Sequence, residues 1–566
     1  MLSGLFVKKD SVRDFPPKTF ILLSAVIGFA FAFTFVLFAI VDIFSLNHEE
    51  IPFNLSTALG IAVPIFLAVW LAVFLLLWLL SKKSDILFAV IASLVFGLVV
   101  SGYLQGAFLN SSVGELTGDE VLWEKLGKET VLNVFIWLVI LIAPFVIRFC
   151  AGAKAWKFTV FAVCAVVCGM QATNLTVNLI STGAIWNKNL DEYLSDDKTF
   201  ELSSQNNIII FVVDRLDYEY VERVRRDTPG FFDRLDGFTE FTDAMSPYLR
   251  TYPAAAYITT GVPGYYDKTR KQFLGEAYGS SDFIRLLKDN DYTTKYHMTQ
   301  GYAYYSTAQL RGVADNIVYD KVKTNWSSNA GTFFKLSRYR YAPLCLKKAY
   351  WLAEVGFPQD VQNHVRVEDD DPAFYQMLME NGLTVRSDQN NYMYIHLQGS
   401  HPPYVMDSNS MREDQGTSLV RQTKGVFNIL FEYMDKMKEL GLYENATIII
   451  TGDHGYSVDD SWLAHTPSIG LFIKPKGSAG TPLEQNSAQV SLENLLATIL
   501  QSEGLEHAAF GRSAFDVPEG EEVVRPFWNL VNPVYPRAYM VEYFEISGYS
   551  RDIGNWNKIY ERDATY

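Results

Sequence analysis

Five long runs without charged side chains constrain this chain more than any other feature of its sequence. They cover residues 19–41, 57–80, 86–104, 130–147 and 158–181. Each approaches or exceeds the roughly 20 residues that a helix needs to cross the hydrocarbon core of a bilayer. Barrel strands would also satisfy the backbone inside lipid, but these runs lack the alternation of such strands. Five buried helices of a soluble protein in so short a stretch is a poor alternative, so the sequence predicts an all-α transmembrane bundle of five helices over residues 1–182.

The basic residues between the runs predict how the chain crosses the membrane. Nine of them fall in segments that would share one side: Lys8, Lys9, Arg13, Lys18, Lys82, Lys83, Arg148, Lys154 and Lys157. The segments on the other side have only Lys125 and Lys128. Because cytoplasmic loops are enriched in lysine and arginine, we expect a cytoplasmic N-terminus and an extracytoplasmic C-terminal half. The first run is too long for a cleaved signal peptide, and Asp42 and His48 follow it instead of a small-residue cleavage site.

Charge and cysteine usage narrow the partners of the C-terminal half. Residues 1–182 hold as many acidic as basic side chains, so the net charge of -15 belongs to the rest of the chain. An acidic domain lacks the basic footprint that nucleic acid requires, and it would need a metal or local positive groups to hold an anionic substrate. Cys345 is the only cysteine after residue 182, which excludes an intrachain disulfide there and is typical of bacterial envelope proteins.

The C-terminal half has the pattern of an α/β domain. A polar segment at 183–206 predicts a linker, and the domain is expected over 207–566. Continuous apolar runs, typical of strands buried on both faces of a parallel sheet, lie in 207–214, 392–396 and 446–453. Helical periodicity occurs between them, at 281–289 and 418–441. This alternation predicts a mainly parallel sheet flanked by helices, and the segments 537–546 and 555–561 predict a small antiparallel C-terminal hairpin.

Candidate metal ligands follow three of these predicted strands. Asp214 ends the first, His396 lies in the second, and Asp453 and His454 follow the third. Ligands of α/β sheets collect at the carboxyl ends of strands, and carboxylates with imidazoles suit Zn²⁺ or Mn²⁺. Each residue also has an ordinary interpretation: Asp214 as a helix cap, the Asp453–His454 pair as a plain turn, and His396 and His465 as packed core histidines. These ordinary interpretations would require a coincidence at three strand ends, so we favour the metal site.

A nucleophile is expected in the segment 246–261, which follows the first strand. A hydroxyl at a helix N-terminus meets the positive end of the helix dipole, and metal binding would lower its pKa. Thr251 is favoured because Pro253 fits an early helical position after it. The alternatives are that Thr251 is only a helix cap, or that the nucleophile is one of the other hydroxyls of the segment: Ser246, Thr259 and Thr260.

These motifs resemble those of the alkaline phosphatase/sulfatase superfamily, in particular its membrane-anchored branch of lipoteichoic acid synthases and lipid A phosphoethanolamine transferases. The resemblance rests on the strand ending in Asp214, on RTYP at 250–253 with TTG at 259–261, on HLQGSHPPY at 396–404, and on TGDHG at 451–455. The arrangement of five spans followed by an external domain is similar too. The resemblance implies an alkaline phosphatase-like fold for the C-terminal domain.

The resemblance also implies roles for individual residues. One divalent metal, Mn²⁺ or Zn²⁺, would be held by Asp214, Thr251, Asp453 and His454. Thr251 would attack a phosphodiester and form a phosphothreonine, and His401 would assist the attacking and leaving hydroxyls. His396 and His465 would be second-shell groups or ligands of a second metal. Candidate substrate-binding residues are Arg250, Tyr302, Arg311, Tyr404 and Trp462.

One departure bears on the reaction. Sulfatases have Cys or Ser followed by x-Pro-x-Arg, where the formylglycine nucleophile forms, whereas this chain reads TYPAA at 251–255. The resemblance therefore favours a phosphotransferase that moves a phosphoglycerol or phosphoethanolamine type head group. Its donor would be a membrane phospholipid and its acceptor an envelope glycan or a lipid-linked molecule. The alternatives are an extracytoplasmic phosphodiesterase, phosphatase or sulfatase-type hydrolase, and a non-catalytic envelope protein on the same fold.

Overall fold

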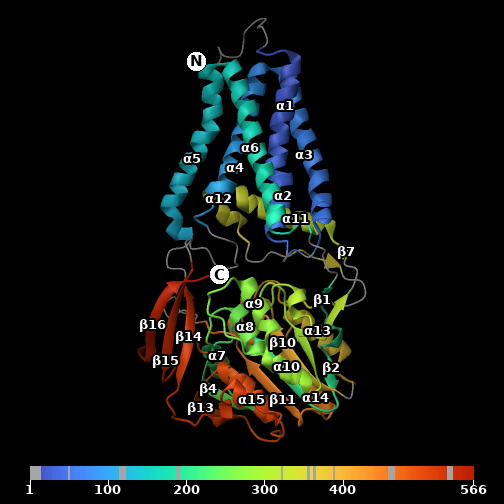
Figure 1. The fold of residues 1–566 in the computed structure, drawn as a ribbon, viewed down its shortest axis with the longest axis vertical. Coiled ribbons are helices and arrows are strands. Elements are labelled where there is room, and N and C mark those ends of the chain that lie inside the picture. The colour runs from blue at the N-terminus through green and yellow to red at the C-terminus, as the bar shows by residue number, and fades with distance from the viewer. Residues whose placement is uncertain are drawn as a thin grey trace. The chain divides into compact units, whose positions relative to one another are not determined.

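The computed structural model of the chain comprises two compact units. It describes residues 14–48, 51, 53–113, 123–186, 192–319, 323–352, 357, 359–360, 365–386, 389–456, 466–531 and 539–565. The helical unit consists of Met1–Leu190, Val322–Asp360 and Tyr535–Arg537, and the sheet unit consists of Asp191–Lys321, Val361–Val534 and Ala538–Tyr566 (Figure 1). The chain therefore leaves the sheet unit in the middle of its sequence and returns to the helical unit.

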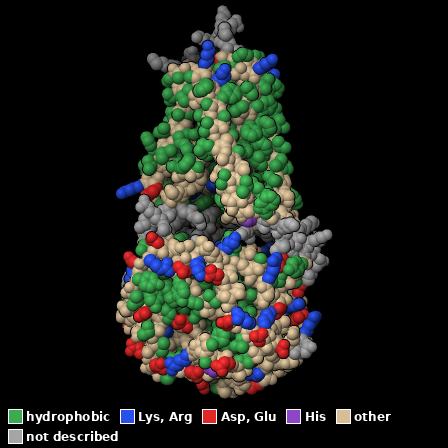
Figure 2. All heavy atoms as spheres, viewed as in Figure 1, with side chains coloured by type: hydrophobic (Ala, Val, Ile, Leu, Met, Phe, Trp, Pro, Cys, Tyr) green, Lys and Arg blue, Asp and Glu red, His purple; other side chains and the backbone are tan. Residues whose placement is uncertain are grey.

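The helical unit contains five helices that are long and apolar enough to cross a membrane. They are Pro17–Leu46, Leu55–Lys83, Asp85–Phe108, Trp123–Ala151 and Ala153–Ser181. The first is built from α1 (Pro17–Ala32), a π-helical turn (Phe33–Phe38) and α2 (Ala39–Leu46), and the others contain α3 (Leu55–Lys83), α4 (Asp85–Phe108), α5 (Gly127–Val146) and α6 (Ala153–Ser181). Hydrophobic side chains cover these helices on the face seen in Figure 2. The five predicted apolar helices are confirmed.

Two later helices belong to the helical unit, which the sequence did not predict. They are α11 (Trp326–Tyr341) and α12 (Leu344–Lys347). Helix α11 contacts α2, α3 and α4, and α12 contacts α5 (Figure 1). The domain expected over 207–566 is thus interrupted by a segment that packs on the N-terminal helices.

A seven-stranded sheet forms the centre of the sheet unit. Its strand order is β13-β4-β12-β11-β3-β10-β5. The strands are β3 (Asn207–Val213), β4 (Thr239–Met245), β5 (Tyr292–His297), β10 (Asn390–Leu397), β11 (Ala446–Thr451), β12 (Leu471–Lys474) and β13 (Glu484–Ser491). Only β12 runs antiparallel to its neighbours, β11 and β4. In the parallel core Val212 of β3 lies opposite both His396 and Thr451, so β3, β10 and β11 end at one edge of the sheet.

Helices cover both faces of this sheet, which explains why residues 208–213 of β3 are all apolar. Ile208, Ile210 and Val212 pack into one core with α8 (Thr251–Thr260), α9 (Arg270–Gly279), α10 (Asp282–Asp289) and α15 (Leu495–Ser502). Ile209, Phe211 and Val213 pack into the other core with α7 (Tyr218–Asp227), α13 (Asp371–Asn381) and α14 (Leu419–Glu439). The predicted α/β class, mainly parallel and flanked by helices, is confirmed.

The expected linker at 183–206 is wrong for its second part. Residues Glu192–Leu194 form β1, which pairs with β6 (Ile317–Tyr319), and Glu201–Ser203 form β2, which pairs with β9 (Thr384–Arg386). The acidic side chains that suggested a solvated segment take part in buried contacts instead. Asp196 lies 2.6 Å from Nδ1 of His297, and Glu192 accepts two hydrogen bonds from Arg311.

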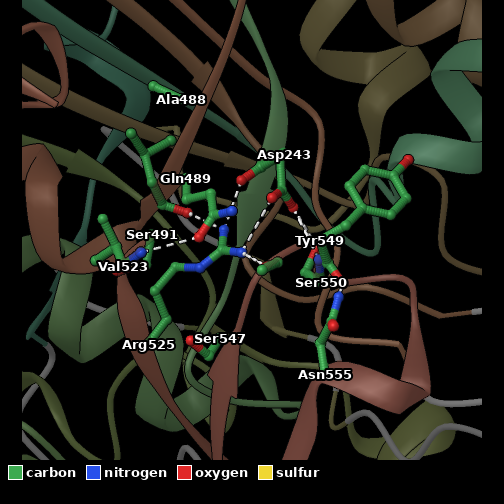
Figure 3. A network of polar contacts seen from close by, with 12 residues as sticks. Asp243, Ala488, Gln489, Ser491, Val523, Arg525, Ser547, Tyr549, Ser550 and Asn555 are labelled. Atoms are coloured by element: carbon green, nitrogen blue, oxygen red, sulfur yellow. Dashed lines mark hydrogen bonds and ion pairs between the residues drawn. The ribbon is translucent and has the colours of Figure 1, made fainter. Parts of the chain in front are cut away.

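The C-terminal strands form a separate antiparallel sheet, as the sequence predicted. It contains β14 (Val524–Val531), β15 (Met540–Ser547) and β16 (Trp556–Asp563). Its attachment to the main sheet is polar: buried Arg525 donates to the backbone oxygen of Asp243 at 2.6 Å and to the Asp243 carboxylate at 3.1 Å (Figure 3). The other carboxylate oxygen of Asp243 accepts from the hydroxyl and backbone N–H of Ser550. This network ties β4 to the start of β14 and to the turn after β15.

We expect Arg525→Gln to destabilise the protein by about 3 kcal/mol or more, because it leaves Asp243 buried without its cation. Arg512→Gln is the matched control, since it removes an ion pair with Glu521 on the surface, where such pairs contribute little. Thermal unfolding of the purified full-length protein in detergent measures both. An equal, small effect of the two substitutions would contradict a structural role for the buried network.

Candidate active site

Asp214, His396, Asp453 and His454 meet at the carboxyl edge of the parallel core. Asp214 directly follows β3, Asp453 follows β11 by one residue, and His396 lies near the end of β10. Because β3 lies between β10 and β11, the register of these strands brings side chains from three distant parts of the sequence together. The candidate ligands that the sequence places at three strand ends therefore lie close together in space.

The distances between these groups are those of an open coordination site. Ligand atoms of Asp214, His396 and Asp453 all lie within 4.8 Å of one another. Nε2 of His454 lies 3.5 Å from Oδ1 of Asp214 and 3.6 Å from Oδ2 of Asp453, and Nε2 of His396 lies 3.9 Å from the same Asp453 oxygen. His454 therefore lines the same small space.

Buried polar atoms in this space lack partners within the described part of the chain. They are Oδ1 of Asp214, Nε2 of His396 and Oδ2 of Asp453. Burying such atoms without a hydrogen bond or a counter-charge is costly, and a divalent cation would satisfy all three at once. Carboxylate oxygens with imidazole nitrogens are ligands that suit Zn²⁺ or Mn²⁺, so the residues present fit a metal.

The pKa values of Asp214 and Asp453 shift in opposite directions. Burial raises the pKa of Asp214 well above its usual value, and the nearby charge of Asp453 raises it further. Burial would also raise the pKa of Asp453, but the charges of His454 and His396 bring that pKa below its usual value. Asp453 also accepts hydrogen bonds from the backbone N–H groups of Arg215 and His454, at 3.0 and 2.8 Å. Without a cation, one member of the pair would retain its proton, which is the behaviour of two acids that share a buried space.

His396 lies closer to the centre of the site than the sequence suggested. Its expected place was a second shell or a second metal, yet it belongs with Asp214 and Asp453 to the group whose ligand atoms converge. His454 is oriented by its own loop: Nδ1 lies 3.1 Å from the carbonyl oxygen of Gly455, which leaves Nε2 directed at the carboxylates. This is the arrangement in which a backbone carbonyl fixes the tautomer of a metal-binding histidine.

Thr251 is the first residue of α8, directly after the helix N-cap Arg250. Burial lowers the pKa of His454, and the charges of Arg215 and Arg250 lower it further. The competing hydroxyls are engaged locally: Thr259 and Thr260 donate to backbone carbonyls of their own helix, and Ser246 accepts from the backbone N–H of Tyr248. Within the described residues, no such bond holds the half-buried Thr251 side chain. Thr251 as the nucleophile stays a prediction.

His401 and Tyr404 follow β10 in the loop 398–404. Burial, together with the charge of Arg215, lowers the pKa of His401 to about 4. Nδ1 of His401 lies 2.6 Å from the carbonyl oxygen of Pro402. Burial raises the pKa of Tyr404, which the charge of Arg215 opposes. Both predicted residues are thus neutral at pH 7 and lie within reach of one arginine.

Arg215 is a site residue that the sequence reasoning missed. Its backbone has a φ of 57°, a conformation uncommon for residues other than glycine, and its guanidinium lies 3.6 Å above the ring centroid of Tyr456. Its Nε is buried, and within the described chain no hydrogen-bond acceptor faces it. The signal was available, since Arg215 is the basic residue directly after the first candidate ligand.

The remaining predicted residues have different outcomes. Arg311 is not free to bind substrate in the way expected, because Glu192 holds its guanidinium through two hydrogen bonds of 2.9 and 2.7 Å. Tyr302 is 46% exposed, and its role in binding stays a prediction. Trp462 and His465 lie outside the described residues.

Known proteins resemble part of this chain. The family model described as Sulfatase matches residues 206–504. Similar solved structures include Ps i-CgsB with k-i-k-neocarrahexaose (14% identity, 63% of this chain, 86% of that chain, TM-score 0.41) and the lipoteichoic acid synthase LtaP from Listeria monocytogenes (14%, 62%, 84%, 0.38). The sulfatase PsFucS1 from Pseudoalteromonas sp. is another (13%, 64%, 84%, 0.34). No curated protein matches the sequence.

We expect the purified full-length protein to bind about one divalent ion per chain after dialysis against Zn²⁺ or Mn²⁺. Asp214→Asn and Asp453→Asn should each lose most of that metal, because each removes a charged ligand from the converging group. Asp227→Asn is the control, since its carboxylate is exposed and pairs with Lys424. Elemental mass spectrometry measures the metal content, and a metal-free wild-type protein would rule out the proposed centre.

Proposed function

This chain belongs to the sulfatase family, and from that premise we propose that it is a metal-dependent phosphotransferase anchored in the cell membrane. It moves a phosphorylated head group of the phosphoglycerol or phosphoethanolamine type from a phospholipid to an envelope glycan or a lipid-linked acceptor. The observation that carries the proposal is the convergence of unpartnered buried ligand atoms from Asp214, His396 and Asp453.

The chemistry follows from the groups around that space. A divalent cation held by Asp214, His396, Asp453 and His454 would supply positive charge for a phosphate oxygen and favour the ionised form of a nearby hydroxyl. Oγ1 of Thr251 forms a bond to phosphorus while the bond from phosphorus to the diacylglycerol oxygen breaks. The threonine loses a proton and the leaving oxygen gains one, and His401 is the imidazole placed to exchange it. An acceptor hydroxyl then attacks the phosphothreonine, and the threonine regains its proton.

The nucleophile segment supports phosphoryl transfer over sulfate-ester hydrolysis. The sequence TYPAA at 251–255 has neither the modifiable Cys or Ser nor the following Arg that formylglycine formation uses in sulfatases. A threonine hydroxyl at a helix N-terminus is instead suited to attack phosphorus directly, since the helix dipole favours the negative charge that develops there.

The membrane helices support a lipid donor. A phospholipid remains in the bilayer, so an enzyme that uses its head group gains from being anchored to the same surface. We infer from the distribution of lysine and arginine that the N-terminus is cytoplasmic and that the catalytic domain lies outside. A second metal, which would involve His465, stays a prediction.

Hydrolysis is the second candidate function, because the matching family is named for hydrolases. The same covalent step would then be followed by attack of water. Incubation with a labelled phospholipid, with and without an extracted envelope glycan, separates the two: transfer of label to the glycan supports the transferase, and release of the free head group alone supports the hydrolase. Absence of both activities in a metal-loaded protein would support a non-catalytic role.

We expect Thr251→Ala to abolish the phosphorylated adduct and to reduce turnover by about 10³-fold or more, because it removes the attacking oxygen. Thr251→Ser should retain part of the activity. Mass spectrometry of peptides from enzyme incubated with bacterial phospholipids would locate the adduct, and its added mass would name the head group. An adduct that persists in Thr251→Ala and disappears in Ser246→Ala would assign the nucleophile to the competing hydroxyl.

Arg215 is proposed to bind a non-bridging oxygen of the substrate phosphodiester through its unpartnered Nε. We expect Arg215→Gln to lower kcat/KM by roughly 10- to 100-fold, the range of one charge-assisted hydrogen bond, while the metal content is unchanged. Arg215→Lys should recover part of the loss, since it restores charge without the guanidinium geometry. Arg223→Gln is the control, because Arg223 pairs with Glu219 on the surface of α7. Normal kinetics of Arg215→Gln would exclude this role.

A further inference from the structure

The segment Trp326–Tyr350 lies inside the matched sulfatase sequence, yet it packs with the N-terminal helices. Its contacts are close enough to need glycines on the helices beneath it. A Cβ atom added at Gly60 of α3 would lie 2.7 Å from the Trp326 ring, and one added at Gly106 of α4 would lie 2.7 Å from the Tyr341 ring. Both ends of α11 are therefore fitted to particular positions of the bundle.

Polar contacts fix this segment as well. Arg340 forms an ion pair of 2.7 Å with Asp42, a fully buried carboxylate of α2 that also accepts a hydrogen bond from Asn178. The side chain of Asn133 in α5 accepts from the backbone N–H of Leu344. Charged and amide groups at the ends of apolar helices are satisfied by this segment, so its position at that end of the bundle is specific.

The outward side of the same segment is basic. Lys335, Arg338 and Lys348 are exposed, and the sequence has no acidic residue from Trp326 to Trp351, although the chain as a whole carries a net charge of -15. Large apolar side chains are exposed beside them: Trp326 is 52%, Leu346 is 49% and Tyr350 is 36% exposed. Basic residues mixed with exposed tryptophan, tyrosine and leucine are typical of helices that lie in a membrane interface.

We propose that the segment Trp326–Tyr350 forms an interfacial surface that binds anionic phospholipid head groups through Lys335, Arg338 and Lys348. We assign anionic phospholipid as the ligand for two reasons: its charge complements the basic side chains, and the segment lies where lipid head groups are expected. The segment crosses the ends of helices that are long enough to span a bilayer, which is the level of the phosphate groups of lipids. This inference needs the membrane anchor but does not need the catalytic proposal, so the two can fail separately.

The test is lipid retention by the full-length protein. Native mass spectrometry of detergent-solubilised protein counts bound phosphatidylglycerol and phosphatidylcholine in a competition. We expect the wild type to retain phosphatidylglycerol in several-fold excess, and the triple variant Lys335→Gln, Arg338→Gln, Lys348→Gln to lose most of that preference. The matched control removes three exposed positive charges from the sheet unit: Arg226→Gln, Arg285→Gln and Arg386→Gln. Retention of the preference by the first triple variant, or its absence in the wild type, would overturn the proposal.

A second measurement tests the proposal even if the triple variant fails to fold. Cys345 lies exposed in α12, so a nitroxide can be attached there after Cys150, Cys164 and Cys168 are replaced by alanine. In vesicles that contain phosphatidylglycerol, we expect accessibility to a water-soluble nickel chelate to be several-fold below that of a label at Arg226→Cys on the sheet unit. Equal accessibility at the two positions would show that the segment is in water and would overturn the interfacial assignment.

Discussion

The parallel pairing of β10, β3 and β11 is the constraint from which the candidate site arises. Once Val212 is opposite His396 and Thr451, the residues that follow each strand must emerge at one edge of the sheet. The pairing thereby forces Asp214 and Asp453 into a buried space where two negative charges would repel each other. Such a pair is tolerable only with protons, histidines or a cation to compensate it, so the fold itself creates the demand that a metal would meet.

How far the sequence predicts this molecule depends on whether a signal is local. The apolar runs that form the five helices and β3, β10 and β11 are determined by which side chains can be buried, and that information lies within each segment. Asp214, Asp453 and His454 could be selected from the sequence as well. Each lies at the end of a predicted strand, and parallel strands end at the same edge of a sheet. The antiparallel C-terminal strands were equally visible in local alternation around Gly548.

The errors of the sequence reasoning concern partners that lie far along the chain. Glu192 and Asp196 are charged, which suggested a solvated linker, and only the distant Arg311 and His297 make their burial possible. Periodicity also does not reveal that Nε2 of His396 lies 3.9 Å from the Asp453 carboxylate. Arg215 was overlooked because its use depends on a left-handed backbone conformation and on Tyr456, neither of which an amino-acid pattern displays.

The segment around α11 connects the sulfatase sequence to the helical unit at a second point. The chain passes from the helical unit to the sheet unit near Asp191, returns at Val322 and leaves again after Asp360, so the sulfatase sequence is joined to the apolar helices in its interior as well as at its start. A truncated protein without the helices would expose Phe333 and would leave Arg340 without Asp42. The apolar helices are thus part of the folding environment of α11, a segment that lies within the matched sulfatase sequence.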